Sequence, residues 1–459
     1  MISVYMDHGH LTEGDIAKLV WKIALPASIG FFFNTMFNVV DAFYGGKLGT
    51  DALAAMSASF PIFFLIIAAS SGVGSAASSL IGNALGAKDT KKAKEYYLTA
   101  IFIGVAVSIV LTIIGLLVSE PLFEELGLQG ASLQYALDYT NMIFYGTIFF
   151  VLANILNSYL LAIGDTKTFS KSLIFSFILN VILDPWFMYG GFGVKPMGLA
   201  GIAFATILVQ LIQCIYIGFK SRKLHLLRGF RELKCSKETV KEIFVQAVPS
   251  SVNMMTVAIG SFILTYFIGV YGTDAVAAYG TAVRIEQIIL IPSIGLNIAA
   301  LALAGQSSGA RNYERIREII KATTRIALYL SGVALIVLLF GGKLLMKVFS
   351  KDPTVISIGT TYLYFAAFIF LSYILIFVGS SILQAVKRPS KALAISVVRQ
   401  IIVPVILFTI VTKVFHLEIT AIWTLILITN WLGAFVTNKI VERELKVLEA
   451  KKETLVQSA

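Results

Sequence analysis

Residues 49–55 read GTDALAA and residues 272–278 read GTDAVAA, a repeat at an offset of 223 positions, the difference between 272 and 49. The same offset pairs ALPAS at 24–28 with AVPSS at 247–251, and GNALGAK at 82–88 with GQSSGAR at 305–311. Matches that share one constant offset are the mark of an internal repeat. The chain is therefore predicted to consist of two homologous halves.

The composition is that of a polytopic membrane protein. Of 459 residues, 57% are hydrophobic and 14% are charged, with a mean hydropathy of +0.84, which excludes an ordinary soluble protein. Apolar runs of about 20 residues, long enough to cross a bilayer, recur along the chain. The twelve expected spans are 17–44, 52–80, 96–118, 132–161, 170–190, 198–219, 243–270, 275–304, 322–341, 355–384, 392–413 and 419–438.

The positive charges set the expected orientation. Most of the 37 Lys and Arg residues fall on one side of the spans when both termini are cytoplasmic, so the net charge of +11 reflects topology and not nucleic-acid binding. The expected domains are an N-lobe at 1–219, a basic cytoplasmic loop at 220–241, a C-lobe at 242–440 and a cytoplasmic tail at 441–459. Six spans in each half give both lobes the same orientation, which predicts an all-α membrane fold with two lobes related by a pseudo-twofold axis. Such repeats are typical of transporters.

Two aspartates interrupt the apolar spans of the first half alone. Asp41 follows FNVV, and Asp184 lies in NVILDPWF. At the offset of 223, the second half has Leu264 and Leu407 instead. An ionised carboxylate at membrane depth costs at least about 2.5 kcal/mol, so a scaffold that works without the acids has no structural need of them. Asp41 and Asp184 are therefore the leading functional candidates.

Other polar side chains accompany the aspartates at helical spacing. They are Asn34 and Asn38 before Asp41, Asn180 before Asp184, the pair Asn154 and Asn157, and Tyr139. Because both acids fall in the outer third of outward-running spans, we expect them to share a pocket. Such a pocket suits either a proton shared by two carboxyl groups or a Na⁺ ion held by carboxylate and amide oxygens. Hydrogen bonding between helices is an equal alternative for the asparagines.

The second half contains charges of its own, Arg284 and Glu286 in VRIEQ, and Arg399. Residues two apart on a helix do not face each other, so Glu286 is expected to pair with Arg399 or with another helix. We expect all three to be buried and structural, the alternative being that they face the substrate.

Prolines interrupt the first span of each half, at Pro26 and Pro249. A proline removes one helical hydrogen bond and kinks the helix, so Pro26 is a candidate hinge. Aromatic and sulfur-containing residues near these prolines, in FFFNTMF and VNMMT, suit the binding of flat lipophilic cations. The candidate cleft-lining residues are Asn34, Phe37, Asn38, Asn154 and Met255.

Taken together, the motifs resemble those of multidrug and toxic compound extrusion (MATE) transporters, closest in pattern to their prokaryotic DinF-like branch. The resemblance rests on Pro26, Asp41, the two GTDA turns and N-x-x-L-D-P at 180–185. It implies the MATE/MOP fold and an antiporter of the cytoplasmic (inner) membrane that exports amphiphilic, often cationic compounds in exchange for H⁺ or Na⁺ by alternating access. The positions that match the family's coupling network are Asp41, Asn180 and Asp184, with Tyr139 and Asn157 as neighbours. Other members have acids in the C-lobe, and Leu264 here favours the N-lobe site.

Three alternatives were weighed against this interpretation. A flippase for a lipid-linked precursor, of the same superfamily, would be expected to have several cations in its cleft. An aspartyl protease using the two aspartates lacks the G-x-G-D context, and nothing indicates a channel. We therefore expect a transporter and not an enzyme. We expect a monomer in the lipid bilayer that acts on small organic substrates, with no nucleic-acid partner, no cofactor, and no metal beyond Na⁺ at Asp41 and Asp184.

Overall fold

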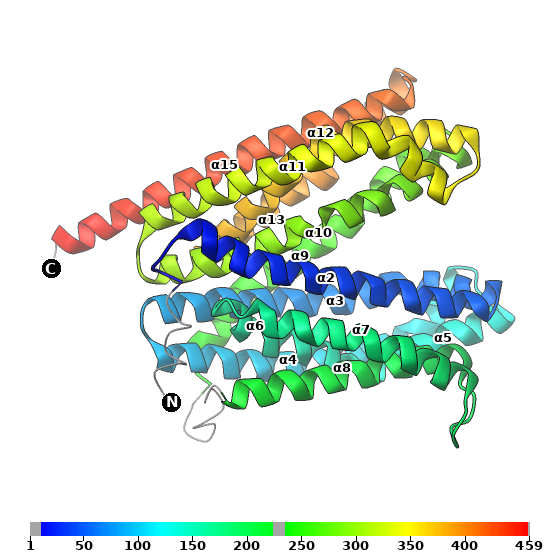
Figure 1. Cartoon of the computed structure of the whole chain (residues 1–459), viewed down its shortest axis with the longest axis horizontal. Coiled ribbons are helices and arrows are strands. Elements are labelled where there is room, and N and C mark those ends of the chain that lie inside the picture. Colours follow the sequence, from blue (N-terminus) through cyan, green and yellow to red (C-terminus); the bar gives the residue numbers. More distant parts are fainter. Residues whose placement is uncertain (1–10, 224–234, 458–459) are drawn as a thin grey trace. The chain divides into compact units, whose positions relative to one another are not determined.

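The computed structural model describes residues 11–223 and 235–457, and almost all of them are helical (Figure 1). The helices of the first half are α2 (Ile16–Lys47), α3 (Thr50–Gly86), α4 (Thr90–Glu125), α5 (Gly130–Tyr145), α6 (Thr147–Ala162), α7 (Thr166–Tyr189) and α8 (Gly198–Lys223). Those of the second are α9 (Lys237–Gly269), α10 (Thr273–Gly309), α11 (Tyr313–Phe349), α12 (Pro353–Ala385), α13 (Pro389–Val397), η1 (Val398–Ile402), α14 (Val403–Thr409), η2 (Ile410–Val414) and α15 (Ile419–Gln457). Here η marks a π-helical segment.

The expected membrane-spanning helices are confirmed. Eleven spans in the described residues are long and apolar enough to cross a membrane, and α5 with α6 makes a twelfth, bent by 44°. The bend falls at Gly146, where an added Cβ would lie 2.3 Å from Cγ1 of Ile207 on α8. Close packing of α8 therefore accompanies a break that the uninterrupted apolar run at 132–161 did not predict. The last helix also continues to Gln457, well beyond the expected end of its span at 438.

The sequence repeat is also a repeat of backbone conformation. Gly49 and Gly272 precede α3 and α10 with φ angles of 117° and 104°, a region open to glycine. At the other ends of these helices, Lys88 and Arg311 both adopt positive φ, at 62° and 54°. The two halves therefore begin and end the same helix in the same way.

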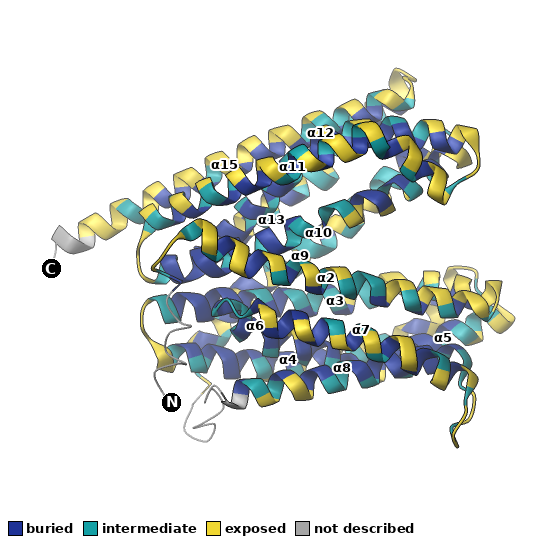
Figure 2. Ribbon diagram, in the orientation of Figure 1, coloured by how far each residue is buried: buried dark blue, intermediate teal, exposed yellow. Residues whose placement is uncertain are grey.

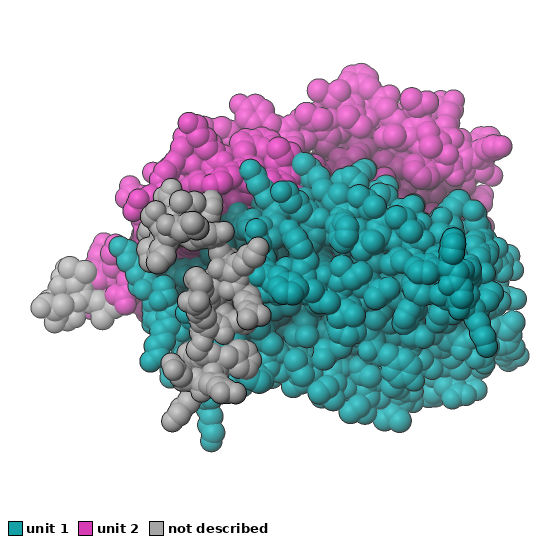
Figure 3. Space-filling view, turned by 60° about the horizontal axis from the view of Figure 1, so that its bottom comes forward, with its two compact units in different colours: residues 1–10, 29–251 teal, residues 11–28, 252–459 magenta. Residues whose placement is uncertain are grey.

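The helices form two compact units, coloured separately in Figure 3. Unit 1 comprises residues 1–10 and 29–251, and unit 2 comprises residues 11–28 and 252–459. The chain thus passes from one unit to the other inside α2 and inside α9, two residues beyond Pro26 and Pro249. The expected lobes, 1–219 and 242–440, were contiguous. In the structure, by contrast, the first part of α2 belongs to unit 2 and the first part of α9 belongs to unit 1, so the units exchange these two segments. Of the expected basic loop at 220–241, residues 224–234 lie outside the described residues.

Hydrogen bonds hold the start of each exchanged helix. In unit 1, Lys92 Nζ of α4 donates to Thr239 Oγ1 at 2.8 Å, at the start of α9. In unit 2, Arg315 of α11 occupies the position 223 residues after Lys92, and its Nη2 donates to the carbonyl oxygens of Glu13 at 2.9 Å and Gly14 at 3.1 Å, just before α2. Equivalent basic residues therefore anchor equivalent helix starts.

Each unit has its own apolar core and also exposes large apolar side chains; Figure 2 shows how buried and exposed residues alternate along the helices. On α11, for example, Leu338 is fully buried in unit 2, whereas Phe340 and Leu344 are 83% and 69% exposed. Large apolar side chains on both sides of a long helix suit a chain whose outer surface meets lipid.

Candidate functional site

The two aspartates of the first half lie together in unit 1, joined by one asparagine. Asn180 Nδ2 donates to Asp41 Oδ1 at 2.8 Å and to Asp184 Oδ1 at 2.8 Å. Asn180 and Asp184 are four residues apart on α7 and therefore share a face, while Asp41 comes from α2. All three side chains are buried. The structure thus brings together the two aspartates that the sequence singled out, whereas their role as a binding site stays a prediction.

The shared Asn180 amide also brings the two carboxyl groups close enough to interact electrostatically. Two ionised carboxylates placed close together repel each other, and a proton on one of them removes that repulsion. Asp184 Oδ2 is buried without a hydrogen-bond partner, as is Asn180 Oδ1. If both carboxyl groups were ionised, Asp184 Oδ2 would carry a negative charge that no hydrogen bond compensates.

Three more polar residues contribute to this region of unit 1. Tyr139 of α5 is buried and close enough to interact electrostatically with both aspartates. Thr206 of α8, which the sequence did not single out, has its Oγ1 3.4 Å from Asp41 Oδ2 and donates to the Ile202 carbonyl at 3.0 Å. Asn157 of α6 is buried with its Oδ1 unpaired, and no hydrogen bond between described residues joins it to either aspartate.

The candidate cleft-lining residues differ in their exposure. Asn38 and Asn154 are exposed, and Asn34 and Met255 are half-buried. The Asn38 amide donates to the Asn34 carbonyl, one turn back on the same helix, at 3.0 Å. Phe37 instead packs in an apolar cluster of unit 1 with Leu183 and Phe187. Substrate contact by any of these residues stays a prediction.

The charges of the second half are not equivalent to one another. Arg284 is exposed, which corrects the expectation that it is buried, because Glu286 takes the core-facing side of α10 and a residue two positions away points elsewhere. Glu286 Oε2 accepts a hydrogen bond from the Tyr362 hydroxyl of α12 at 2.7 Å, so Glu286 does pair with another helix. Arg399 is half-buried and forms no ion pair among the described residues.

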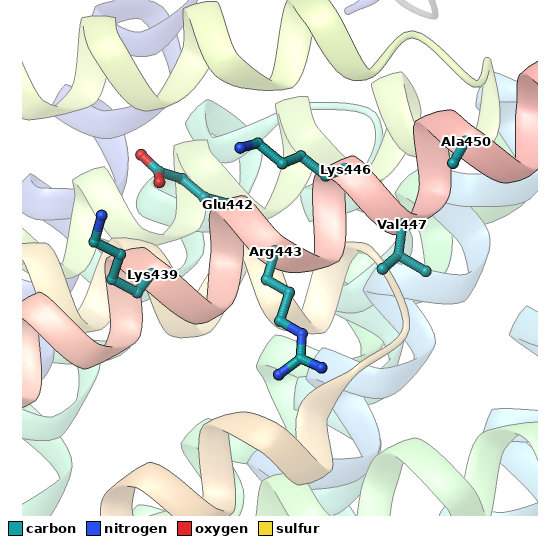
Figure 4. A pocket seen from close by; sticks show the side chains of 6 residues that line it. All are labelled: Lys439, Glu442, Arg443, Lys446, Val447 and Ala450. Carbon is teal, nitrogen blue, oxygen red and sulfur yellow. The ribbon is translucent and has the colours of Figure 1, made fainter.

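A surface hollow of about 470 Å³ lies along the end of α15, far along the chain from the aspartate pair (Figure 4). Its lining consists of Lys439, Glu442, Arg443, Lys446, Val447 and Ala450. All six follow the expected end of the last span at 438, and cations outnumber the single acid. The hollow offers no counterpart of the buried carboxyl pair.

With the bent pair α5 and α6 counted as one, twelve spans in the described residues, divided between two homologous halves, define a multi-pass membrane protein with the organisation of a transporter. The MatE family model matches it twice, at residues 26–186 and 249–410, once in each half. The chain therefore belongs to the MATE family of transporters.

Relatives and solved structures agree with this assignment. The chain is 29% identical to the probable multidrug resistance protein YoeA of Bacillus subtilis over 351 residues, 75% of either chain. It is 26% identical to an FAD transporter of Shewanella oneidensis over 86% of this chain and 88% of that protein. The crystal structure of a MATE protein in the bent conformation superimposes with a TM-score of 0.90, at 24% identity, over 97% of this chain and 98% of the other. That match confirms the predicted fold.

Proposed function

We propose that the protein is a secondary active antiporter of the cytoplasmic membrane, with both termini in the cytoplasm. It exports amphiphilic, often cationic organic compounds in exchange for H⁺, and Asp41 and Asp184 are the coupling site. The observation that carries this proposal is the pair of buried carboxyl groups bridged by the Asn180 amide. The multidrug resistance relative supports the class of substrate.

The direction of the hydrogen bonds favours a proton over Na⁺. Asn180 turns its NH₂ group, and not its carbonyl oxygen, toward both acids. A Na⁺ ion needs oxygen ligands, so Asn180 could act as one only if its amide turned over. A proton needs no such change, because the two carboxyl groups already lie close enough to interact electrostatically. Na⁺ is therefore the second candidate for the coupling ion.

Helix α2 supplies a route from ion binding to movement. It holds Asp41 in unit 1, while its first part, which includes Pro26, belongs to unit 2. Pro26 removes a backbone hydrogen bond inside this helix, so bending there costs less than elsewhere. Protonation of the carboxyl pair alters the contact between Asp41 and Asn180, and so changes how strongly the outer part of α2 is held against α7. Helix α2 then bends at Pro26, and this bend accompanies alternating access.

Transport by purified protein in liposomes tests the proposal, with a pH gradient and a Na⁺ gradient imposed separately. Ethidium should accumulate against its gradient when only the pH gradient is present, and Asp41→Asn should abolish this movement without reducing the amount of folded protein. Asp51→Asn, the same change at an exposed aspartate in the first turn of α3, is the matched control. Accumulation driven by Na⁺ alone would replace the proton with Na⁺, and full ethidium transport by Asp41→Asn would remove the coupling role from this site.

The flippase alternative receives little support from the described spans. Binding a pyrophosphate headgroup requires several cations. Of the two arginines considered, Arg399 is half-buried and Arg284 is exposed, so they do not form a buried pair.

A further inference from the structure

A short hairpin joins α7 to α8 in unit 1. Gly191 and Val194 pair across it, and the N–H of each donates to the carbonyl oxygen of the other at 3.0 Å. The two residues between them, Phe192 and Gly193, have φ angles of 51° and 87°. Positive φ at both central positions is a feature of type I′ turns, which favour Asn, Asp or Gly over a bulky side chain. Phe192 therefore occupies a position that glycine would fill with less strain.

The side chain of Phe192 is also fully exposed, at 100% of its surface. Hydrogen bonds to α7 hold the hairpin that presents it. The Trp186 indole N–H donates to the Gly191 carbonyl at 3.0 Å, and the Met197 N–H donates to the Phe187 carbonyl at 3.0 Å. The protein thus holds an aromatic ring away from its own surface at the cost of backbone strain, and strain of this kind is concentrated at functional positions.

A stripe of exposed apolar side chains along α7 leads to the hairpin. Its members recur at helical spacing: Phe175, Ile178, Ile182, Trp186 and Tyr189. They lie on the side of the helix opposite the buried Asn180 and Asp184, and so on the outer surface of unit 1. An exposed apolar side of a membrane-spanning helix meets lipid, and Trp and Tyr are the residues enriched where lipid meets water. The stripe therefore reaches the membrane surface at Trp186 and Tyr189, next to the hairpin.

The hairpin continues this lipid-facing surface sideways. In Figure 1 it extends from the ends of α7 and α8 across the direction of the helix axes and away from the helices. Since spanning helices run across the bilayer, a segment transverse to them runs along the bilayer surface. The exposed Lys195 on the same hairpin forms no ion pair among the described residues, and a lysine at this level can reach lipid phosphate groups.

We propose that Phe192 is a membrane-interface anchor, whose ring inserts among the phospholipid headgroups of the outer leaflet. Aromatic side chains bind at this level of a bilayer, and interfacial anchors set the tilt and rotation of a spanning helix. Because α7 carries Asn180 and Asp184, the anchor also fixes the position of the carboxyl pair in the membrane. The assignment to the outer leaflet rests on the proposed orientation of the chain, and lipid contact by the ring does not depend on the proposed export.

A nitroxide spin label at Phe192→Cys tests lipid contact in phospholipid liposomes, with Cys235→Ser removing the exposed native thiol. Ile182→Cys on the lipid-facing stripe and Glu125→Cys, an exposed position at the end of α4, carry the reference labels. Relative to the label at Glu125→Cys, the label at Phe192→Cys should collide more often with O₂, which concentrates in lipid, and less often with a water-soluble nickel complex. Nickel collisions as frequent as those at Glu125→Cys would overturn the inference. Shielding from both reagents, or coupling to the label of a second copy, would show a protein contact and overturn it as well.

A second measurement separates the phenylalanine ring from the label. A label at Lys195→Cys reports the position of the hairpin while residue 192 varies. Phe192→Gly suits the positive φ and keeps the turn, and it should raise the collisions of this label with the nickel complex. Phe192→Trp, the matched control, should leave them unchanged. An unchanged collision rate in Phe192→Gly would refute the anchor. Ethidium transport is not measured here, so a failure of the export proposal would leave this result standing.

Discussion

Among the described residues, Asn180 is the side chain that donates a hydrogen bond to both aspartates, and replacing it by leucine removes both bonds. Leucine has a similar size, so the packing of α7 is kept while two hydrogen bonds of 2.8 Å are lost. A hydrogen bond to a charged group contributes about 1.5–3 kcal/mol. Because a pair that shares a proton carries one negative charge, we expect a net loss of about 1.5–3 kcal/mol from one charged and one neutral contact, partly offset by the burial of leucine.

Thermal unfolding of the purified protein in detergent measures this effect. For a unit of this size, the expected loss lowers the unfolding midpoint by about 3–10 °C. Asn38→Leu is the control, since the Asn38 side chain donates only to the Asn34 carbonyl of its own helix. Proton-driven ethidium transport should also fall at least about tenfold in Asn180→Leu, because the carboxyl pair loses its alignment. A midpoint for Asn180→Leu no lower than that of Asn38→Leu would refute the reasoning.

Three further predictions concern stability. The Tyr271 hydroxyl donates to the Leu417 carbonyl at 2.8 Å, and burial raises the pKa of this hydroxyl. Folding therefore favours the neutral form of Tyr271. The contribution of Tyr271 to the free energy of unfolding is complete below the usual pKa of about 10 and is lost only as the pH rises through the higher pKa of the folded protein. Tyr271→Phe should therefore lower the unfolding free energy by about 1 kcal/mol at both about pH 6 and about pH 8, and a cost that differs between them would contradict this. Glu444, whose side chain is 6% exposed, forms ion pairs with the half-exposed Arg388 and Lys391 at the start of α13. Glu444→Gln should lower the free energy of unfolding, measured with a denaturant, by about 1–2 kcal/mol. An unchanged free energy of unfolding would show that these ion pairs do not stabilise the protein. A Cβ added at Gly72 of α3 would lie 2.7 Å from the backbone nitrogen of Ser251 on α9. Gly72→Ala should therefore lower the free energy of unfolding by about 1–3 kcal/mol. An unchanged midpoint of thermal unfolding would mean that α9 moves aside at no cost.

Most of the fold could be predicted because the sequence has two strong features, its long apolar runs and its internal repeat. Long apolar runs must form helices in a membrane, where no water satisfies the backbone, and the offset of 223 reveals the repeat directly. The exchange of helix segments between the units was missed, since periodicity reports which residues are apolar and not which neighbours they meet. The equivalence of Lys92 and Arg315, which hold the exchanged helix starts, was a usable clue in the same offset.

The candidate site was predicted in outline for a similar reason. Asn180 and Asp184 share a face by spacing alone, and the absence of Asp41 and Asp184 from the second half marked them as a pair. Thr206 was missed because threonine is common in apolar helices and its position beside Asp41 depends on tertiary packing. The same limit explains Arg284, whose exposed position depends on the direction in which α10 turns Glu286.

Proton release on substrate binding tests the central claim most directly. In a weakly buffered detergent solution at neutral pH, ethidium added to the wild-type protein should release protons in proportion to the substrate bound. Asp41→Asn should bind ethidium and release none, because it lacks one of the two carboxyl groups between which the released proton is shared. Equal proton release from wild type and Asp41→Asn would contradict the account, as would wild-type binding that displaces Na⁺ and no proton.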